Sequence, residues 1–87
     1  MKEESEYTEE QLKRPAMTYV HLLDDILRDI GTGDLQEIYE ALCKKWPYYR
    51  YRAGTSGWQS SVRHNLLQND HFLRNGKNGK SSMWIIN

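Results

Sequence analysis

The sequence is poor in cysteine and has no long apolar run. A single cysteine, Cys43, excludes an internal disulfide and points to a reducing compartment. No apolar stretch approaches the roughly 18 residues that a membrane helix needs. The acidic start MKEESEYTEE resembles neither a secretory signal nor a transit peptide. The sequence therefore predicts a soluble intracellular protein with no membrane partner.

A length of 87 residues leaves room for one small domain. Hydrophobic residues make up 38% of the chain and include three tryptophans, enough to build a core. A domain of this size buries only about 60–65% of the surface of its unfolded chain. We therefore expect a single domain of modest stability.

The charges are separated along the chain, although the net charge is zero. Residues 1–12 contain one lysine and five glutamates, a net charge of −4, and residues 13–43 have a net charge of −3. Residues 44–87 hold eight basic side chains and one aspartate, a net charge of +7. A basic half of this strength is typical of a nucleic-acid surface, but it also fits a solvated face.

Apolar periodicity predicts two helices after an acidic tail. Residues 1–13 lack such periodicity and are expected to be disordered. A first helix is expected within residues 17–31, with Thr18 as its N-cap and Gly31 as its stop. A second is expected over 34–46, where Asp34 and Glu37 form an acidic capping box. Pro47 should end it, and a turn-rich connection follows.

A third helix is predicted over about residues 57–68, opened by a capping box of Ser56 and Gln59. Trp58, Val62 and Leu66 form an apolar stripe, and we expect Trp58 in the core between this helix and the first one. The opposite face is almost wholly polar. It comprises Ser60, Arg63, His64 and Leu67, flanked by Ser61, Asn65 and Gln68.

Such a polar face has two interpretations. A helix fits the major groove of DNA, where arginine can pair with guanine and short polar side chains reach base edges. Most polar helix faces, however, meet only water. The pattern alone leaves both open.

The last segments, 71–74 and 81–87, have strand-like composition around the turn sequence NGKNGK. They predict a hairpin with a basic tip. The expected fold is therefore α+β, mainly α: a winged helix, with a three-helix helix-turn-helix core followed by a β-hairpin wing.

Five motifs, in this order, resemble the forkhead (Fox) DNA-binding domain, and the likeness covers residues 14–87. RPAMTYVHLL resembles the family's opening pattern, EIY occurs in its second helix, and WPYYR in the turn that follows. WQSSVRHNL resembles its recognition helix, and Gly79, Lys80 and Trp84 match its last strand. Together they are far more specific than any single motif.

The resemblance implies a monomeric, cofactor-free domain of a nuclear transcription factor that binds double-stranded DNA sequence-specifically, with protein partners in transcription. The third helix would lie in the major groove and the wing on the phosphate backbone. The base contacts would be made by Ser60, Arg63 and His64. The contacts to the DNA backbone would be made by Tyr19, Ser61, Lys77, Lys80, Ser82 and Trp84.

Besides Ala16 and Met17 in the opening motif, two residues on the polar face of the third helix depart from the family pattern. Ser60 stands where the family has an asparagine, and a serine hydroxyl cannot make the bidentate pair with adenine. Leu67 stands where the family has a serine. These departures favour an alternative, a forkhead-fold protein-interaction module with weak or nonspecific DNA binding. A linker-histone-like winged helix ranks third because the chain has no lysine-rich tail.

Enzymatic and metal chemistry are disfavoured. His21 and Asp25 lie one helical turn apart, but no nucleophile or third orienting group accompanies them. His64 and His71 do not share a ligand spacing, and a single cysteine argues against a zinc site. Tyr48, Tyr49 and Tyr51 could stack on single-stranded bases, but beside Trp46 and Pro47 they are expected to pack.

Overall fold

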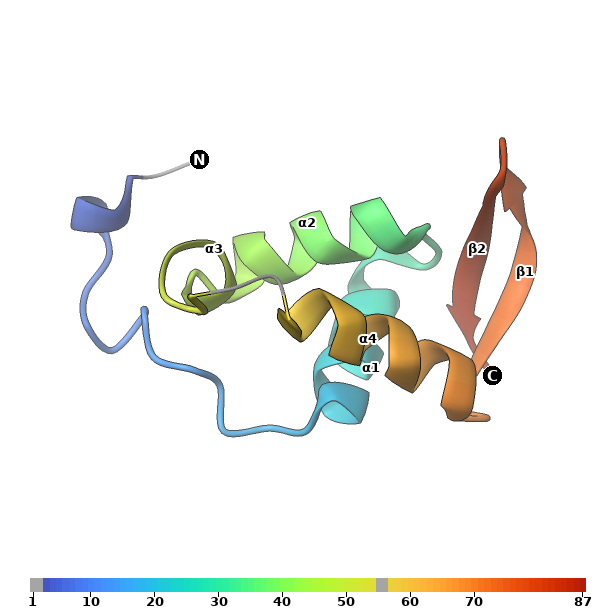
Figure 1. The fold of residues 1–87 in the computed structure, drawn as a ribbon, viewed down its shortest axis with the longest axis horizontal. Coiled ribbons are helices and arrows are strands. Elements are labelled where there is room, and N and C mark those ends of the chain that lie inside the picture. Colours follow the sequence, from blue (N-terminus) through green and yellow to red (C-terminus); the bar gives the residue numbers. More distant parts are fainter. Residues whose placement is uncertain (1–2, 55–56) are drawn as a thin grey trace.

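The computed structural model describes residues 3–54 and 57–87. Three longer helices pack together, the hairpin stands at one end, and the N-terminal segment lies at the other (Figure 1). This mainly helical winged helix confirms the predicted fold class. The elements are η1 (Glu4–Glu6), α1 (Tyr19–Ile30), α2 (Leu35–Lys45), α3 (Tyr48–Tyr51), α4 (Gly57–Gln68), β1 (Phe72–Asn78) and β2 (Ser81–Ile86).

The predicted ends of the first two helices are confirmed. The Thr18 side chain accepts a hydrogen bond from the backbone N–H of His21, and Gly31 ends α1 with a φ of 79°. Asp34 and Glu37 cap the start of α2 reciprocally. The box predicted for the third helix includes Ser56, which lies outside the described residues.

The segment after Pro47 differs from the expected turn-rich connection because it contains the one-turn helix α3. Pro47 has a φ of −57°, which already suits a helix, and its carbonyl accepts the N–H of Tyr51 at 3.0 Å. Tyr49 is buried in the core and anchors the turn. Proline lacks an N–H but suits the start of a helix, so Pro47 both ends α2 and opens α3.

One apolar core joins the helices to the hairpin. Removing this apolar surface from water is the main stabilising contribution, about 25 cal/mol per Å². The buried side chains come from every long element: Leu22, Leu23, Ile26 and Leu27 from α1, Ile38 and Leu42 from α2, Tyr49 from α3, Val62 and Leu66 from α4, Phe72 from β1 and Trp84 from β2.

Trp58 is half-buried and packs against this core, but not where the sequence placed it. Its aromatic partners are Tyr39 of α2, in an edge-on contact with ring centroids 5.5 Å apart, and Tyr49 of α3, at 5.0 Å. The expected position between α4 and α1 is therefore wrong. The sequence interpretation did not include α3, which supplies the second ring.

The hairpin is longer than expected on its first strand. Arg74 pairs with Trp84 and Lys77 with Ser82, so β1 holds one extra residue between these pairs. Gly76, in this bulge, has a φ of 83°, a conformation that glycine adopts without strain. Four of the six residues of NGKNGK are thus strand, and the tight turn lies at Gly79 and Lys80.

The wing is fixed to the helical core through the loop between α1 and α2. Gly33 and Trp84 exchange two backbone hydrogen bonds, at 3.3 and 2.9 Å, and the Thr32 hydroxyl donates to the same Trp84 carbonyl at 3.1 Å. A Cβ on Gly33 would lie 2.9 Å from Ile30 Cδ1 and 3.3 Å from Glu37 Cβ, so a larger residue would require the Ile30 side chain to move. This loop therefore pairs with β2 through a single isolated bridge.

A polar cluster ties α1 to the start of the hairpin. Asp24 accepts from Arg28 Nε at 2.8 Å, and its other oxygen lies 2.6 Å from His71 Nε2. Asp24 and His71 are 47 residues apart in sequence, so their contact sets how the wing meets α1.

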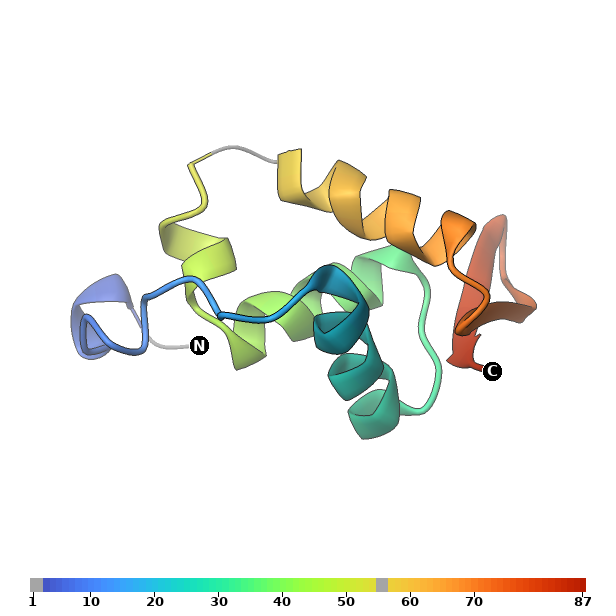
Figure 2. The same cartoon turned by 90° about the horizontal axis from the view of Figure 1, so that it is seen from below.

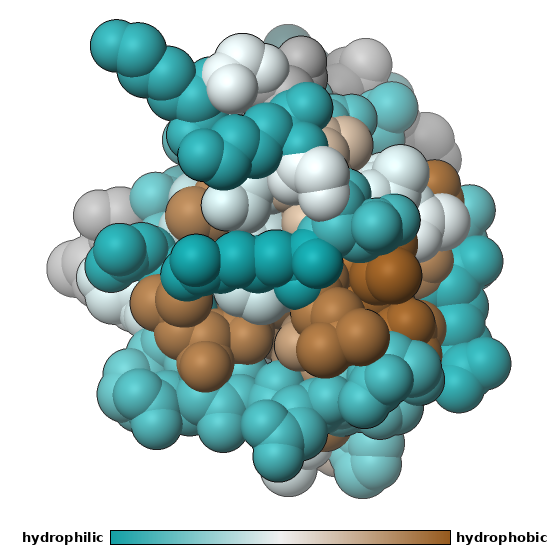
Figure 3. Space-filling view, turned by 90° about the vertical axis from the view of Figure 1, so that its right-hand side faces the viewer, coloured by the Kyte–Doolittle hydropathy of each residue, from teal (hydrophilic) through white to brown (hydrophobic). Residues whose placement is uncertain are grey.

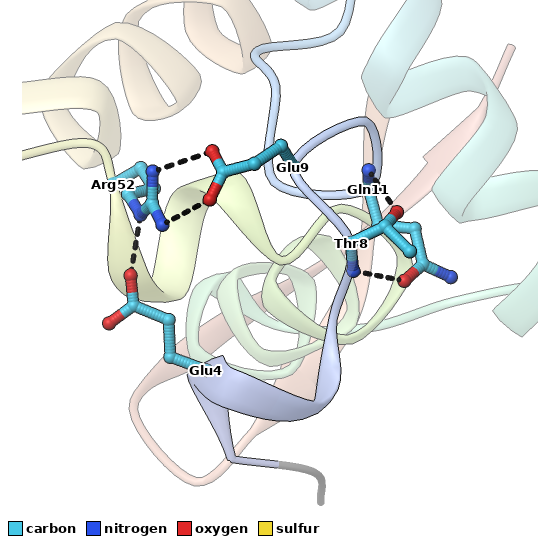
Figure 4. Close-up of polar contacts among 5 residues, drawn as sticks. All are labelled: Glu4, Thr8, Glu9, Gln11 and Arg52. Atoms are coloured by element: carbon cyan, nitrogen blue, oxygen red, sulfur yellow. Dashed lines mark hydrogen bonds and ion pairs between the residues drawn. The ribbon is translucent and has the colours of Figure 1, made fainter.

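The N-terminal segment lies against the α3 end of the domain (Figure 4). Arg52 donates to Glu4 at 2.5 Å and to both carboxylate oxygens of Glu9 at 3.3 Å. Leu12, which the sequence pattern grouped with the acidic tail, is buried at 4% exposure. The disorder expected for residues 1–13 stays a prediction, while these contacts give the segment a place to dock.

We expect Leu23→Ala to destabilise the domain by about 2–5 kcal/mol, because Leu23 is fully buried and its truncation leaves a cavity. Thermal or urea melts give the free energy of unfolding. Leu73→Ala is the control: its side chain is 42% exposed, so the change should stay within about 0.5 kcal/mol. Equal losses of stability for both variants would contradict this assignment of the core.

A second prediction concerns the stability of the fold at low pH. The hydrogen bond from Arg28, followed by that from His71, lowers the pKa of Asp24 below its ordinary value. A carboxyl group with a lower pKa in the folded state stabilises folding above its unfolded pKa, and this contribution disappears as pH falls through the folded pKa.

Asp24→Asn should therefore flatten the loss of stability between about pH 5 and 2, measured by urea midpoints. Asp25→Asn, which leaves both hydrogen bonds in place, is the matched control and should keep the parent's slope. The cluster would have no role in acid stability if the two variants had the same slope.

Candidate nucleic-acid interface

Helix α4 lies along one edge of the molecule, with the other helices on its inner side only (Figure 2). Val62 and Leu66 face inward and are 0% and 1% exposed. The outward face holds the exposed side chains of the predicted base-contacting residues Ser60, Arg63 and His64, together with Leu67 and Gln68. The predicted division of this helix into a core face and an outer face is confirmed.

A hydrogen bond from α2 positions α4, and another forms within the helix itself. The Tyr39 hydroxyl of α2 donates to the Gln59 carbonyl at 3.1 Å, which fixes the first half of the helix. Within the helix, the Asn65 side-chain amide donates to the Ser61 carbonyl at 2.8 Å. Asn65 is therefore occupied within its own helix, whereas Arg63 and His64 project outward.

A hollow of about 230 Å³ lies between α4 and the wing. It brings Arg63 close to the wing residues Arg74 and Lys80, which are far away in sequence. The Arg74 guanidinium carbon stands 5.4 Å from the centroid of a Trp84 ring, a cation–π contact that holds this charge in place. The complete lining is Leu35, Arg63, Leu67, Arg74, Lys80, Ser81, Ser82 and Trp84.

The structure divides the basic half of the chain into two groups. At the α3 end, Lys45 pairs with Asp29 at 2.8 Å, and Arg52 pairs with two glutamates. At the other end, no carboxylate of the described residues lies within ion-pair distance of Arg63, Arg74, Lys77 or Lys80. Positive charge without an ion-pair partner among the described residues therefore lies around α4 and the wing, as it also does at Lys44 and Arg50 near α3.

Apolar side chains also reach the surface in this region. Leu67 of α4 and Leu73 of β1 are 43% and 42% exposed. Seen from the hairpin end, apolar residues gather in the middle of the face and hydrophilic ones surround them (Figure 3). This surface can therefore make apolar contacts as well as polar ones.

The residues predicted to contact the DNA backbone are distributed unevenly. Lys80, Ser82 and Trp84 line the hollow with Arg63, and Lys77 is exposed on β1 outside it. Trp84 is only 5% exposed, because its ring belongs to the core. Two further candidates, Tyr19 and Ser61, are half-buried and do not line the hollow. Phosphate contact by any of these residues stays a prediction.

Sequence reasoning missed three residues of the hollow. Arg74 entered only as one charge of the basic half, and Leu35 only as a core position of its helix. Ser81 adjoins the predicted Ser82 but was not singled out. Their shared location depends on the pairing of β1 with β2 and on the packing of α2 beside α4, neither of which the local sequence specifies.

The other conspicuous side chains have structural partners. His21 Nδ1 lies 3.2 Å from the Thr18 hydroxyl oxygen, at the cap of α1. Burial raises the pKa of Tyr49 to about 12 and also raises the pKa of the Cys43 thiol. The expected packing role of Tyr49 is confirmed, since it contacts Tyr19, Tyr48 and Trp58.

Within residues 3–54 and 57–87, no three His, Cys, Asp or Glu side chains gather as a metal site requires. In the same residues, every helix is too short or too polar to span a bilayer.

Comparisons with known proteins agree with this geometry. The family model of the forkhead domain matches residues 13–87. The chain is 39% identical over 74 residues to the pre-rRNA-processing protein FHL1 of Saccharomyces cerevisiae, covering 82% of this chain and 8% of that protein. It is 34% identical over 85 residues to human forkhead box protein L3, covering 90% and 36%.

Rat forkhead box protein Q1 is 36% identical over 81 residues, with 85% of this chain and 20% of that protein covered. The chain thus spans between 8% and 36% of the length of these three relatives.

Proposed function

The chain belongs to the forkhead family, and from that premise we propose that it binds double-stranded DNA sequence-specifically as part of a nuclear transcription factor. Helix α4 enters the major groove, and the wing contacts the phosphate backbone. No catalytic step is included, because the family acts by binding.

One observation carries the proposal: the outer face of α4 adjoins a hollow in which Arg63, Arg74 and Lys80 gather without a carboxylate partner among the described residues. Positive charges that approach phosphates release the counterions condensed on DNA, which drives association. The hollow places this charge beside the helix that reads bases, so attraction and readout occur on the same face.

Three exposed side chains of α4 contact the bases. Arg63 pairs with the O6 and N7 acceptors of a guanine, an interaction worth about 1–3 kcal/mol of discrimination. His64 lies beside it on the same face and contacts a neighbouring base edge. The Ser60 hydroxyl makes a single hydrogen bond, so this position discriminates less strongly than an asparagine would.

Phosphate contacts set the register of the domain on the duplex and carry no sequence information. Lys77 and Lys80 provide two such contacts from the wing, where both are exposed. Ser82 donates from the edge of the hollow. We include Tyr19, Ser61 and Trp84 as supporting backbone contacts, made through the small part of each side chain that reaches the surface.

A second function is favoured by specific residues. The exposed Leu67 and Leu73, together with a serine at position 60, suit a protein-interaction module that binds DNA weakly or nonspecifically. Selection from random-sequence duplexes separates the two functions. An enriched motif supports sequence-specific binding, and the absence of one favours the interaction module.

On the selected duplex, Arg63→Ala and His64→Ala should each weaken binding by about 1–3 kcal/mol, and by far less on a scrambled duplex, because base contacts contribute discrimination. Ser60→Asn should shift preference toward A-rich sites. Titrations at one salt concentration measure these effects. Lys45→Ala, at the α3 end, is the control and should leave both affinities unchanged. Equal weakening on both duplexes would exclude base readout by this face.

Replacing Lys77 and Lys80 with alanine should weaken all duplexes alike and reduce the slope of log K against log salt by about 0.9 for each phosphate that is no longer neutralised. Binding measured across a series of salt concentrations gives this slope. Lys45→Ala removes a lysine that pairs with Asp29 at the other end of the domain and should leave the slope unchanged. A changed sequence preference at constant slope would mean that the wing reads bases.

A further inference from the structure

Leu67 is an aliphatic side chain on the outer face of α4, one helical turn beyond Arg63. It is 43% exposed, whereas its neighbour Leu66 is 1% exposed. Residues four apart lie on the same face of a helix, so Leu67 and Arg63 point toward the same surroundings. The core does not require this leucine, and its apolar surface is available to another molecule.

The surroundings of Leu67 limit what that molecule can be. Leu67 lines the hollow, where Leu35 and Trp84 add apolar surface and Arg63, Arg74 and Lys80 add positive charge. Coulomb repulsion disfavours a cationic partner there and favours a polyanion. A polyanion held by these cations would also cover the leucine between them.

On the basis of the proposed DNA binding, we propose that Leu67 is a specificity-determining residue that reads thymine through its C5-methyl group. A leucine side chain has no hydrogen-bonding group, so it cannot read donors or acceptors on base edges. The thymine methyl is the apolar group that the major groove displays.

The helix also indicates where this thymine lies relative to the base read by Arg63. Four residues advance a helix by about 6 Å, and base pairs are about 3.4 Å apart, so the thymine lies within about two base pairs of that base. The serine found at this position elsewhere in the family could donate a hydrogen bond instead. The substitution therefore replaces polar readout with apolar readout.

The test uses the duplex enriched by selection, with its thymines replaced one at a time by deoxyuridine, which lacks only the C5-methyl group. For the parent protein, one replacement near the Arg63 contact should weaken binding about 4-fold, the effect expected for one buried methyl group. Leu67→Ser should bind the thymine and deoxyuridine duplexes equally at that position.

Leu73→Ser is the matched control, because Leu73 is equally exposed but does not line the hollow. It should keep the parent's preference for the methyl group. The melting temperature of Leu67→Ser should match that of the parent, since an exposed side chain adds little to the core.

The results that would contradict this inference can be told apart from those that would contradict the proposed function. If Leu67→Ser weakens the thymine and deoxyuridine duplexes equally at every position, the contact is to sugar or phosphate, and the inference is overturned. If Leu67→Ser leaves DNA binding unchanged but abolishes binding to a protein, it is also overturned. Failure to enrich any duplex would overturn the proposed function as well, whereas an enriched duplex without a methyl effect overturns this inference alone.

Discussion

The interface depends on the burial of Val62 and Leu66 on one side of α4. These two side chains are almost fully enclosed by the core, and they fix the rotation of the helix about its own axis. Once that rotation is set, the helical repeat directs Ser60, Arg63 and His64 outward. Any change that rotated α4 would turn the whole polar face at once, so the packing of this helix and the orientation of its outer face cannot be separated here.

The wing acquires its position from a second constraint, the hydrogen bonds between Gly33 and Trp84. A two-stranded hairpin alone is marginally stable in water. Here the loop after α1 pairs with β2, the Trp84 ring enters the core, and Asp24 holds His71 at the start of the hairpin. These contacts are what bring the wing cations beside α4.

Charge compensation differs between the two ends of the domain. The acidic groups of the chain neutralise Lys45 and Arg52 at the α3 end, where the N-terminal segment docks. The cations near α4 keep their charge uncompensated within the described part of the chain. Although the net charge of the protein is zero, the face around α4 and the wing is therefore positive, and composition alone could not have located it.

The sequence by itself determined the three longer helices, the presence of the hairpin and the caps of α1 and α2. Thr18, Asp34 and the apolar spacing of α4 act through residues three or four apart, so local patterns suffice to predict them. Tertiary structure alone decided the partners of Trp58, the one-turn helix at Tyr48–Tyr51, and the hollow that unites Arg63 with Arg74. The physical reason is that these depend on contacts between segments far apart in sequence, whose geometry is fixed only when the shared core forms.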